Sequence, residues 1–219
     1  MPIDELIDAC KVGDLERVRS LLDTDPSLAG GRAASGETPV IAALYRGHTA
    51  IVQYLVKHEA PLDIFAAAAL GRRDVVEERL QADPGSIGRH AYDGWTPLHL
   101  AAFFGETVVL LHLLAQGADV TVRSTNSIKN TPLHAAVAGG RVEAALALID
   151  AGSDVNAPDG GGHTPFHIAA EGGYIPIVEA LLRHGADPLA VDAEDQTPLS
   201  RAAARHHDAV VDLINLKRS

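Results

Sequence analysis

The sequence predicts an all-α repeat protein, a solenoid of about seven helix pairs. A tetrad Thr-Pro-Leu-His begins at Thr96 and again at Thr131, and Thr-Pro-Phe-His begins at Thr164, so the copies recur at a nearly constant spacing. The apolar fraction is 47% but aromatic residues make up only 4%, which indicates a core of small and aliphatic side chains. A third marker, a glycine that ends the first helix of each unit, recurs at Gly13, Gly47, Gly71, Gly105, Gly140 and Gly173, with His206 in the last position.

Each regular unit carries the local signals of two helices. The Thr of the tetrad can accept hydrogen bonds from free backbone N–H groups of the helix that it begins, and the Pro stands at the first helical position, where no N–H is needed. The glycine then ends the helix in the left-handed conformation. Apolar pairs one turn apart predict the second helix, for example at Val109, Leu110, Leu113 and Leu114.

The first half of the chain has a longer period, which indicates a duplicated doublet of helix pairs. A set of markers recurs in register, so that Gly13, Leu22, Asp25, Pro26, Gly36, Thr38, Pro39 and Gly47 return as Gly71, Leu80, Asp83, Pro84, Gly94, Thr96, Pro97 and Gly105. The first and third units lack the Thr-Pro start and run into an Asp-Pro loop.

The unit boundaries follow from these markers. The segment from Gly47 to Gly71 is too short for two helices and a full hairpin, so we expect a shortened hairpin before the third unit. We expect one domain over 1–219, with cap units at 1–34 and 193–219 and internal units at 35–192.

Three segments carry a family resemblance. Asp-Gly-Trp-Thr-Pro-Leu-His-Leu-Ala-Ala (93–102), Ala-Gly-Ser-Asp-Val-Asn-Ala (151–157) and His-Gly-Ala-Asp-Pro-Leu-Ala (184–190) resemble the ankyrin repeat. Asp-Pro-Ser-Leu-Ala (25–29) is similar to bacterial members of that family. The resemblance implies antiparallel helix pairs joined by β-hairpin-type loops, with a concave face made by the hairpin tips and the first helices.

Charge and composition restrict the partners. The formal net charge is −11, which repels phosphate backbones and anionic lipid surfaces, so we expect neither nucleic acid nor membrane as a partner. The longest apolar run, 64–70, is too short to span a bilayer. The single cysteine, Cys10, lies on the predicted buried face of the first helix and fits a reducing compartment. We therefore expect a cytoplasmic monomer.

No residue set predicts catalysis. His99, His134 and His167 occupy the same position in successive units, and the resemblance implies that each bonds the backbone of an adjacent loop. The other histidines are expected on solvent faces, without zinc-site spacing. The glycines 160–162 lack the Lys-Ser/Thr of a phosphate-binding loop and are interpreted as a flexible hairpin tip. We expect no catalytic residue, no metal and no cofactor.

The contact positions of the family predict a partner-binding site. Four of the nine aromatic residues fall within 92–104, and aromatic residues and Arg are the types that anchor interfaces. The candidate partner-binding residues are Tyr45, Arg46, Leu70, Tyr92, Asp93, Trp95, Phe103, Phe104, Ile128, Asn130 and His163.

The sequence therefore favours a non-enzymatic module that binds a protein partner on its concave face, and the negative charge favours a partner with a basic patch. Two alternatives remain open. One is a regulator of an enzyme encoded nearby. The other is a binder of a cationic small molecule or modified residue, which would use the aromatic cluster as a cage beside Asp93.

Overall fold

The computed structural model describes residues 1–218, and within them the chain is helical with no β-strand. It forms two compact units, Met1–Ala66 and Ala67 onward, with the boundary inside one helix. The single domain over 1–219 stays a prediction. The helices of the first unit are α1 (Pro2–Val12), α2 (Leu15–Thr24), the 3-10 helix η1 (Pro26–Gly30), α3 (Pro39–Tyr45) and α4 (Thr49–Lys57), followed by α5 (Ile64–Ala69) across the boundary.

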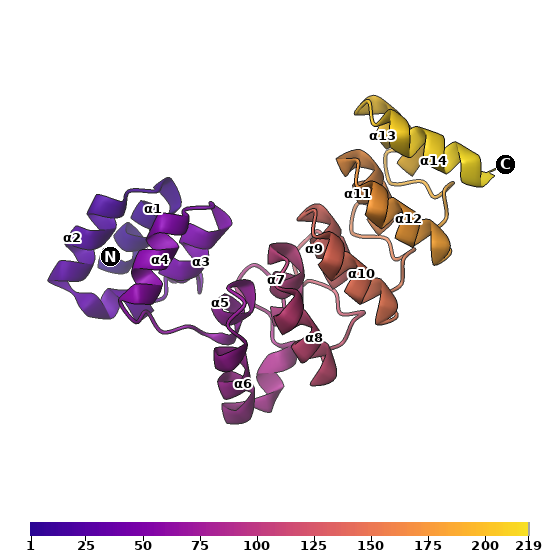
Figure 1. Ribbon diagram of the computed structural model, residues 1–219. Helices are drawn as coiled ribbons and strands as arrows, with labels where there is room; N and C mark the ends of the chain where they lie inside the picture. Colours follow the sequence, from indigo (N-terminus) through magenta and orange to yellow (C-terminus); the bar gives the residue numbers. More distant parts are fainter. Residues whose placement is uncertain (219) are drawn as a thin grey trace. The chain divides into compact units, whose positions relative to one another are not determined.

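The second unit continues the series of helix pairs to the end of the described chain (Figure 1). Seven pairs are present in residues 1–218, as predicted. The second unit contains α6 (Arg73–Ala82), the 3-10 helix η2 (Pro84–Gly88), α7 (Pro97–Phe104), α8 (Thr107–Ala115), α9 (Pro132–Ala138), α10 (Val142–Asp150), α11 (Pro165–Gly172), α12 (Ile175–Arg183), α13 (Pro198–Ala204) and α14 (Asp208–Arg218).

First helices pack on first helices and second helices on second helices. In the first unit α1 packs on α3 and α2 on α4; in the second unit α7, α9, α11 and α13 form one row and α6, α8, α10, α12 and α14 another. The interior between the rows is aliphatic, and Leu98, Leu113 and Leu148 are fully buried. Burial of this continuous apolar surface by neighbouring pairs is what stabilises a repeat protein.

The start and stop signals act as predicted. Thr96 caps α7 by accepting from the N–H of His99, and Gly105 ends α7 at φ 81°, in the left-handed region that favours glycine. The two Asp-Pro segments form η1 and η2 at corresponding places in the two copies, which confirms the duplicated doublet.

Hairpin-type loops join successive pairs of the second unit. In each loop one backbone N–H donates across the tip, as Ala91 does to Trp95 at 2.7 Å and Asp159 does to His163 at 2.8 Å. Neighbouring tips also bond each other: Gly160 N–H donates to the carbonyl of Ile128 at 2.6 Å. A Cβ at position 160 would meet the carbonyl oxygen of Ser127, so the predicted flexible glycine tip is instead a site of close backbone approach.

The connection before the third pair is short, as predicted. Residues 58–63 make no tip, and Ala60 and Leu62 are buried instead. Asp63 accepts from the N–H of Ala66 at 2.8 Å, which caps α5, and its carboxylate also pairs with Arg32 at 2.6 Å.

Candidate functional site

Three aromatic rings of the α7 pair contact one another at the surface. The ring centroids of Trp95 and Phe103 lie 5.1 Å apart at an interplanar angle of 62°, and those of Phe103 and Phe104 lie 5.2 Å apart at 88°. Trp95 also stacks on the buried His99 at 6.0 Å. All three cluster residues are half-buried, whereas the largest buried aromatic side chain, Phe166, is fully enclosed in the core. Such edge-to-face contacts stabilise the cluster itself.

Two more predicted site residues are exposed on the tips. Tyr92 is 40% exposed and Ile128 is 52% exposed. Asp93 is half-buried, and its carboxylate accepts from the N–H of Trp95 at 3.1 Å, so this carboxylate holds the tip that carries the tryptophan.

Asn130, another predicted contact residue, is buried rather than exposed. Its side chain is buried, with 6% of its surface exposed, and its carbonyl accepts from Nε2 of His99 at 3.0 Å. Oδ1 of Asn130 is buried without a hydrogen-bond partner in residues 1–218, so the bonded group of Asn130 described here is its backbone carbonyl, and burial argues against a contact through its side chain.

The remaining predicted residues lie at the ends of first helices. Tyr45 ends α3 in the first unit and is half-buried, and Arg46 follows it and is exposed. Leu70 follows α5 in the second unit and is half-buried.

The three equivalent histidines form a ladder between neighbouring pairs, as the resemblance implied. Nε2 of His99 faces the carbonyl of Asn130 at 3.0 Å, that of His134 faces His163 at 3.0 Å, and that of His167 faces Gln196 at 3.1 Å. Burial lowers the pKa of all three imidazoles, and that of His99 falls to about 4. These histidines are therefore structural.

A second ladder was not predicted. The carbonyl two residues before the helix-ending glycine accepts from a side chain of the next pair: Lys11 from His48 at 3.0 Å, Phe103 from Arg141 at 3.0 Å and Glu171 from His207 at 2.9 Å. His207 is thus half-buried and bonded, which corrects its prediction as a solvent-face residue. The available signal was weak: a side chain with an N–H donor directly follows the residue that ends the first helix at His48, Arg141 and His207, whereas Asp14, Glu106 and Tyr174 stand at the same position in other pairs.

His163 belongs to a charged network that the sequence also did not reveal. Its Nδ1 contacts Asp159 at 3.1 Å, and its Nε2 lies 2.9 Å from a guanidinium nitrogen of Arg201. Arg201 also pairs with Asp192 at 2.6 Å and with Glu171 at 3.1 Å. Arg205 then pairs with Glu171 at 2.6 Å.

The carboxylate of Asp192 is the buried centre of this network. Burial opposes its ionisation, but the N–H of Gln196 and the guanidinium of Arg201 outweigh that cost and bring the pKa of Asp192 to about 2. Arg201 occupies a first-helix position filled by Leu100, Ala135 and Ile168 in earlier pairs. The sequence signal that could have revealed this network was a charged residue at a position that is apolar in earlier pairs.

The remaining residues that could carry chemistry show no reactive or metal-binding arrangement in residues 1–218. Burial first, and then the nearby Glu37 carboxylate, raises the pKa of the Cys10 thiol to about 12, so this thiol is inert. Within residues 1–218 no group of three or more His, Cys, Asp or Glu side chains is arranged to hold a metal ion. In the same part of the chain no helix is long and apolar enough to cross a bilayer.

A repeated helix pair, a ladder of buried histidines and hairpin tips that bond each other define a helical repeat protein. Sequence models of two families match the chain: "Ankyrin repeats (3 copies)" over residues 6–65 and 64–159, and "Ankyrin repeats (many copies)" over residues 148–202. The chain belongs to the ankyrin-repeat family. Ankyrin repeats indicate a protein–protein interaction module.

Similar proteins are larger and eukaryotic. The chain is 30% identical over 118 residues to "Ankyrin repeat and SAM domain-containing protein 6" of Mus musculus, covering 54% of this chain and 11% of that protein. It is 31% identical over 123 residues to "Alpha-latrocrustotoxin-Lt1a" of Latrodectus tredecimguttatus, covering 52% of this chain and 9% of the toxin. It is 40% identical over 95 residues to "Probable E3 ubiquitin-protein ligase XBOS31" of Oryza sativa subsp. japonica, covering 42% of this chain and 21% of the ligase. The bacterial resemblance of residues 25–29 gains no support from these proteins.

Proposed function

We propose that this protein binds a protein partner through the surface made by its first helices and hairpin tips, the expected concave face. The observation that carries the proposal is the surface cluster of Trp95, Phe103 and Phe104. In the same pair Leu98, Leu113 and their neighbours already fill the core, so three large rings at the surface are not needed for folding. Clustered aromatic side chains are the typical anchors of protein interfaces.

The partner proposed here carries a basic patch. The net charge of −11 attracts such a patch from a distance and favours its approach. Asp93 stands beside the cluster, and an aromatic ring next to a carboxylate attracts a cationic side chain. Tyr45, Arg46, Leu70, Tyr92, Ile128 and His163 are the further proposed contact residues.

We propose that this chain has no catalytic activity. The rice relative is a probable E3 ubiquitin-protein ligase, but the match covers 21% of that protein, so its name does not transfer an activity to this chain. Within residues 1–218 the titratable groups with a shifted pKa are a buried thiol, the ladder histidines, several ion-paired side chains and Glu106, whose pKa is raised by burial. None of them lies beside a second group arranged for nucleophilic or acid–base chemistry.

The test compares two phenylalanines of different burial. Phe103 is half-buried in the cluster and Phe166 is fully buried in the core. A partner captured from lysate by the wild-type protein should bind Phe103→Ala at least roughly 30-fold more weakly, a loss of about 2 kcal/mol, while the variant unfolds at nearly the wild-type urea midpoint.

The matched control, Phe166→Ala, should lose about 3–5 kcal/mol of folding free energy through a core cavity. The proposal is overturned if Phe103→Ala keeps full affinity, or if it loses as much folding stability as Phe166→Ala.

A further inference from the structure

A groove on the opposite side of the second unit, among its second helices, is open where the first unit fills the equivalent place. It lies between α6, η2 and α8 and has a volume of about 220 Å³. Three of its wall residues lie on α6, two on η2 and two at the end of α8: Glu77, Leu80 and Gln81; Pro84 and Ile87; His112 and Gln116. None of these residues belongs to the surface proposed above.

The duplicated doublet shows what closes this groove in the first unit. In the register that carries Gly13 onto Gly71, Tyr54 corresponds to His112 and Arg19 corresponds to Glu77. The Tyr54 ring contacts the His58 ring with centroids 4.2 Å apart and the planes tilted by 35°, and the Arg19 guanidinium lies 5.5 Å from the Tyr54 centroid. An aromatic ring with a cation above it therefore occupies the first copy.

In the second copy both parts of that filling are replaced. Histidine is smaller than tyrosine, and Glu77 reverses the charge of Arg19. Leu80 is half-buried, whereas its counterpart Leu22 is only 6% exposed. Nε2 of His112 is buried without a hydrogen-bond partner in residues 1–218, and an unpaired buried polar atom is costly.

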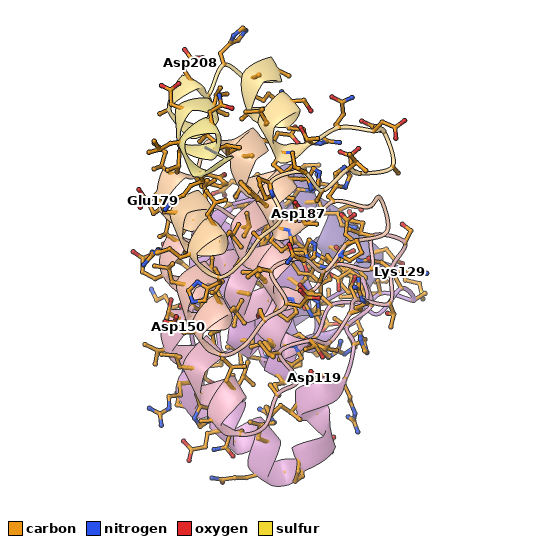
Figure 2. All side chains as sticks on the ribbon, turned by 90° about the vertical axis from the view of Figure 1, so that its right-hand side faces the viewer. Asp119, Lys129, Asp150, Glu179, Asp187 and Asp208 are labelled. Carbon is orange, nitrogen blue, oxygen red and sulfur yellow. The ribbon has the colours of Figure 1, made fainter. Side chains whose placement is uncertain are left out.

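The surface beside the groove is also unusual. On α8, Val108 is 66% exposed and Leu111 is 52% exposed. Later second helices do not expose large aliphatic side chains at these two positions. The position of Val108 holds Glu143 on α10 and Pro176 on α12, both exposed. The position of Leu111 holds Leu146 on α10, which is half-buried, and Glu179 on α12, which is exposed. Figure 2 shows Asp150 and Glu179 on this side of the unit, opposite Lys129 of a hairpin tip. Exposed large apolar side chains next to a groove are typical of an interaction site.

We propose that this groove is a second docking site, which receives an aromatic side chain of a protein partner with a basic residue next to it. The partner's aromatic ring takes the place that Tyr54 has in the first copy. The partner's basic residue pairs with Glu77 and supplies the positive charge that Arg19 supplies in the first copy. A volume of about 220 Å³ is below the 300–1,000 Å³ of sites for drug-sized ligands, which favours a single side chain over a free cofactor. Val108 and Leu111 extend the contact along α8.

The experiment rebuilds the first copy in the second. The variant Glu77→Arg with His112→Tyr fills the groove from within, and it should unfold at a midpoint no lower than that of the wild type. Phage-displayed random peptides are depleted on this variant and then selected on the full wild-type chain. Enriched peptides should carry an aromatic residue beside Arg or Lys and bind the variant at least ten-fold more weakly.

Two controls separate the possible explanations. Glu143→Arg makes the same charge change on α10 and should leave peptide affinity unchanged, and Phe103→Ala separates this groove from the aromatic cluster. If the double variant does not fold, the same peptide-affinity comparison can be made with Glu77→Arg alone, because that substitution changes only an exposed side chain. The proposal is overturned by enriched peptides without an aromatic residue, by equal affinity for both chains, or by a self-associated wild type that becomes monomeric in the variant, since that occupant would be a second copy.

Discussion

The ladder histidines are held in the neutral form by their hydrogen bonds. In His99, Nε2 faces a carbonyl oxygen and must carry the proton, while Nδ1 lies 3.3 Å from the N–H of Thr96 and must accept. The hydroxyl of Thr96 lies 2.8 Å from the same nitrogen and completes the arrangement. A second proton on Nδ1 would face the Thr96 N–H, so protonation breaks the helix cap as well as burying a charge.

The pH dependence of stability follows from His99. Burial lowers its pKa from 6.5 to about 4 in the folded protein. Above pH 6.5 both states are neutral; as the pH falls from there towards 4, only the unfolded state takes up the proton, so stability is lost. We expect His99 to account for a loss of about 2 kcal/mol between about pH 7.5 and pH 5, measured by urea unfolding. His99→Gln should remove this share, and an unchanged pH dependence in that variant would refute the assignment.

Arg201 stabilises the last two pairs by pairing a buried carboxylate. The Asp192 side chain is 0% exposed and the Arg201 side chain is 15% exposed. Arg201→Leu leaves the Asp192 charge without its partner and should cost about 3 kcal/mol of unfolding free energy. Adding Asp192→Asn removes the charge and keeps the oxygen that accepts from Glu194 and Gln196, so the double variant should recover most of the loss. Additive losses in urea unfolding would mean that the pair contributes little.

At the scale of the helix, α8 separates core from surface within one turn. Leu113 is fully buried and Leu111 is 52% exposed on the same helix. Leu113→Ala should cost about 2–5 kcal/mol because a cavity remains, whereas Leu111→Ala should change stability by less than about 0.5 kcal/mol. Urea unfolding of both variants measures the difference. Equal losses would show that α8 packs in another rotation.

The helix pairs could be predicted because their boundary signals are local. Thr96 and Gly105 lie at the two ends of α7, and each acts on the backbone within one turn. The shortened connection at 58–63 followed from chain length alone. These elements need no knowledge of the neighbouring pair.

The site was less predictable because burial depends on neighbours in space. Asn130 stands at a contact position in the sequence, but its side chain is buried, with 6% of its surface exposed, and its carbonyl accepts from the N–H of Ser124 across the tip. The network of Arg201 was not predicted because its partners do not neighbour it in sequence: Asp192 lies in the preceding tip and Glu171 lies in the preceding pair. The groove beside His112 becomes apparent only when the two copies of the doublet are compared in three dimensions.

At the scale of the whole second unit, the main helix contacts join neighbouring pairs, so stability is lost most easily at an end of the row. Within residues 1–218, the main contacts of the last pair, α13 with α14, are with α11 and α12. It also holds two residues other than glycine in the left-handed region, Asp195 at φ 57° and His206 at φ 59°. Such residues cost roughly 1–2 kcal/mol each relative to glycine in that conformation.

We therefore expect the last pair to open before the rest of the second unit. In native-state hydrogen exchange, amides of α13 and α14 should exchange through a smaller opening free energy than those of α9 and α10. His206→Gly should raise the protection of α13 and α14, by about 0.5–1 kcal/mol after allowing for the greater freedom of glycine in the unfolded chain. The change should leave α9 and α10 nearly unaffected, because α9 and α10 pack against α11 and α12, which in turn pack against the last pair. Equal protection across all four helices would contradict this order and would mean that the second unit unfolds as one cooperative block.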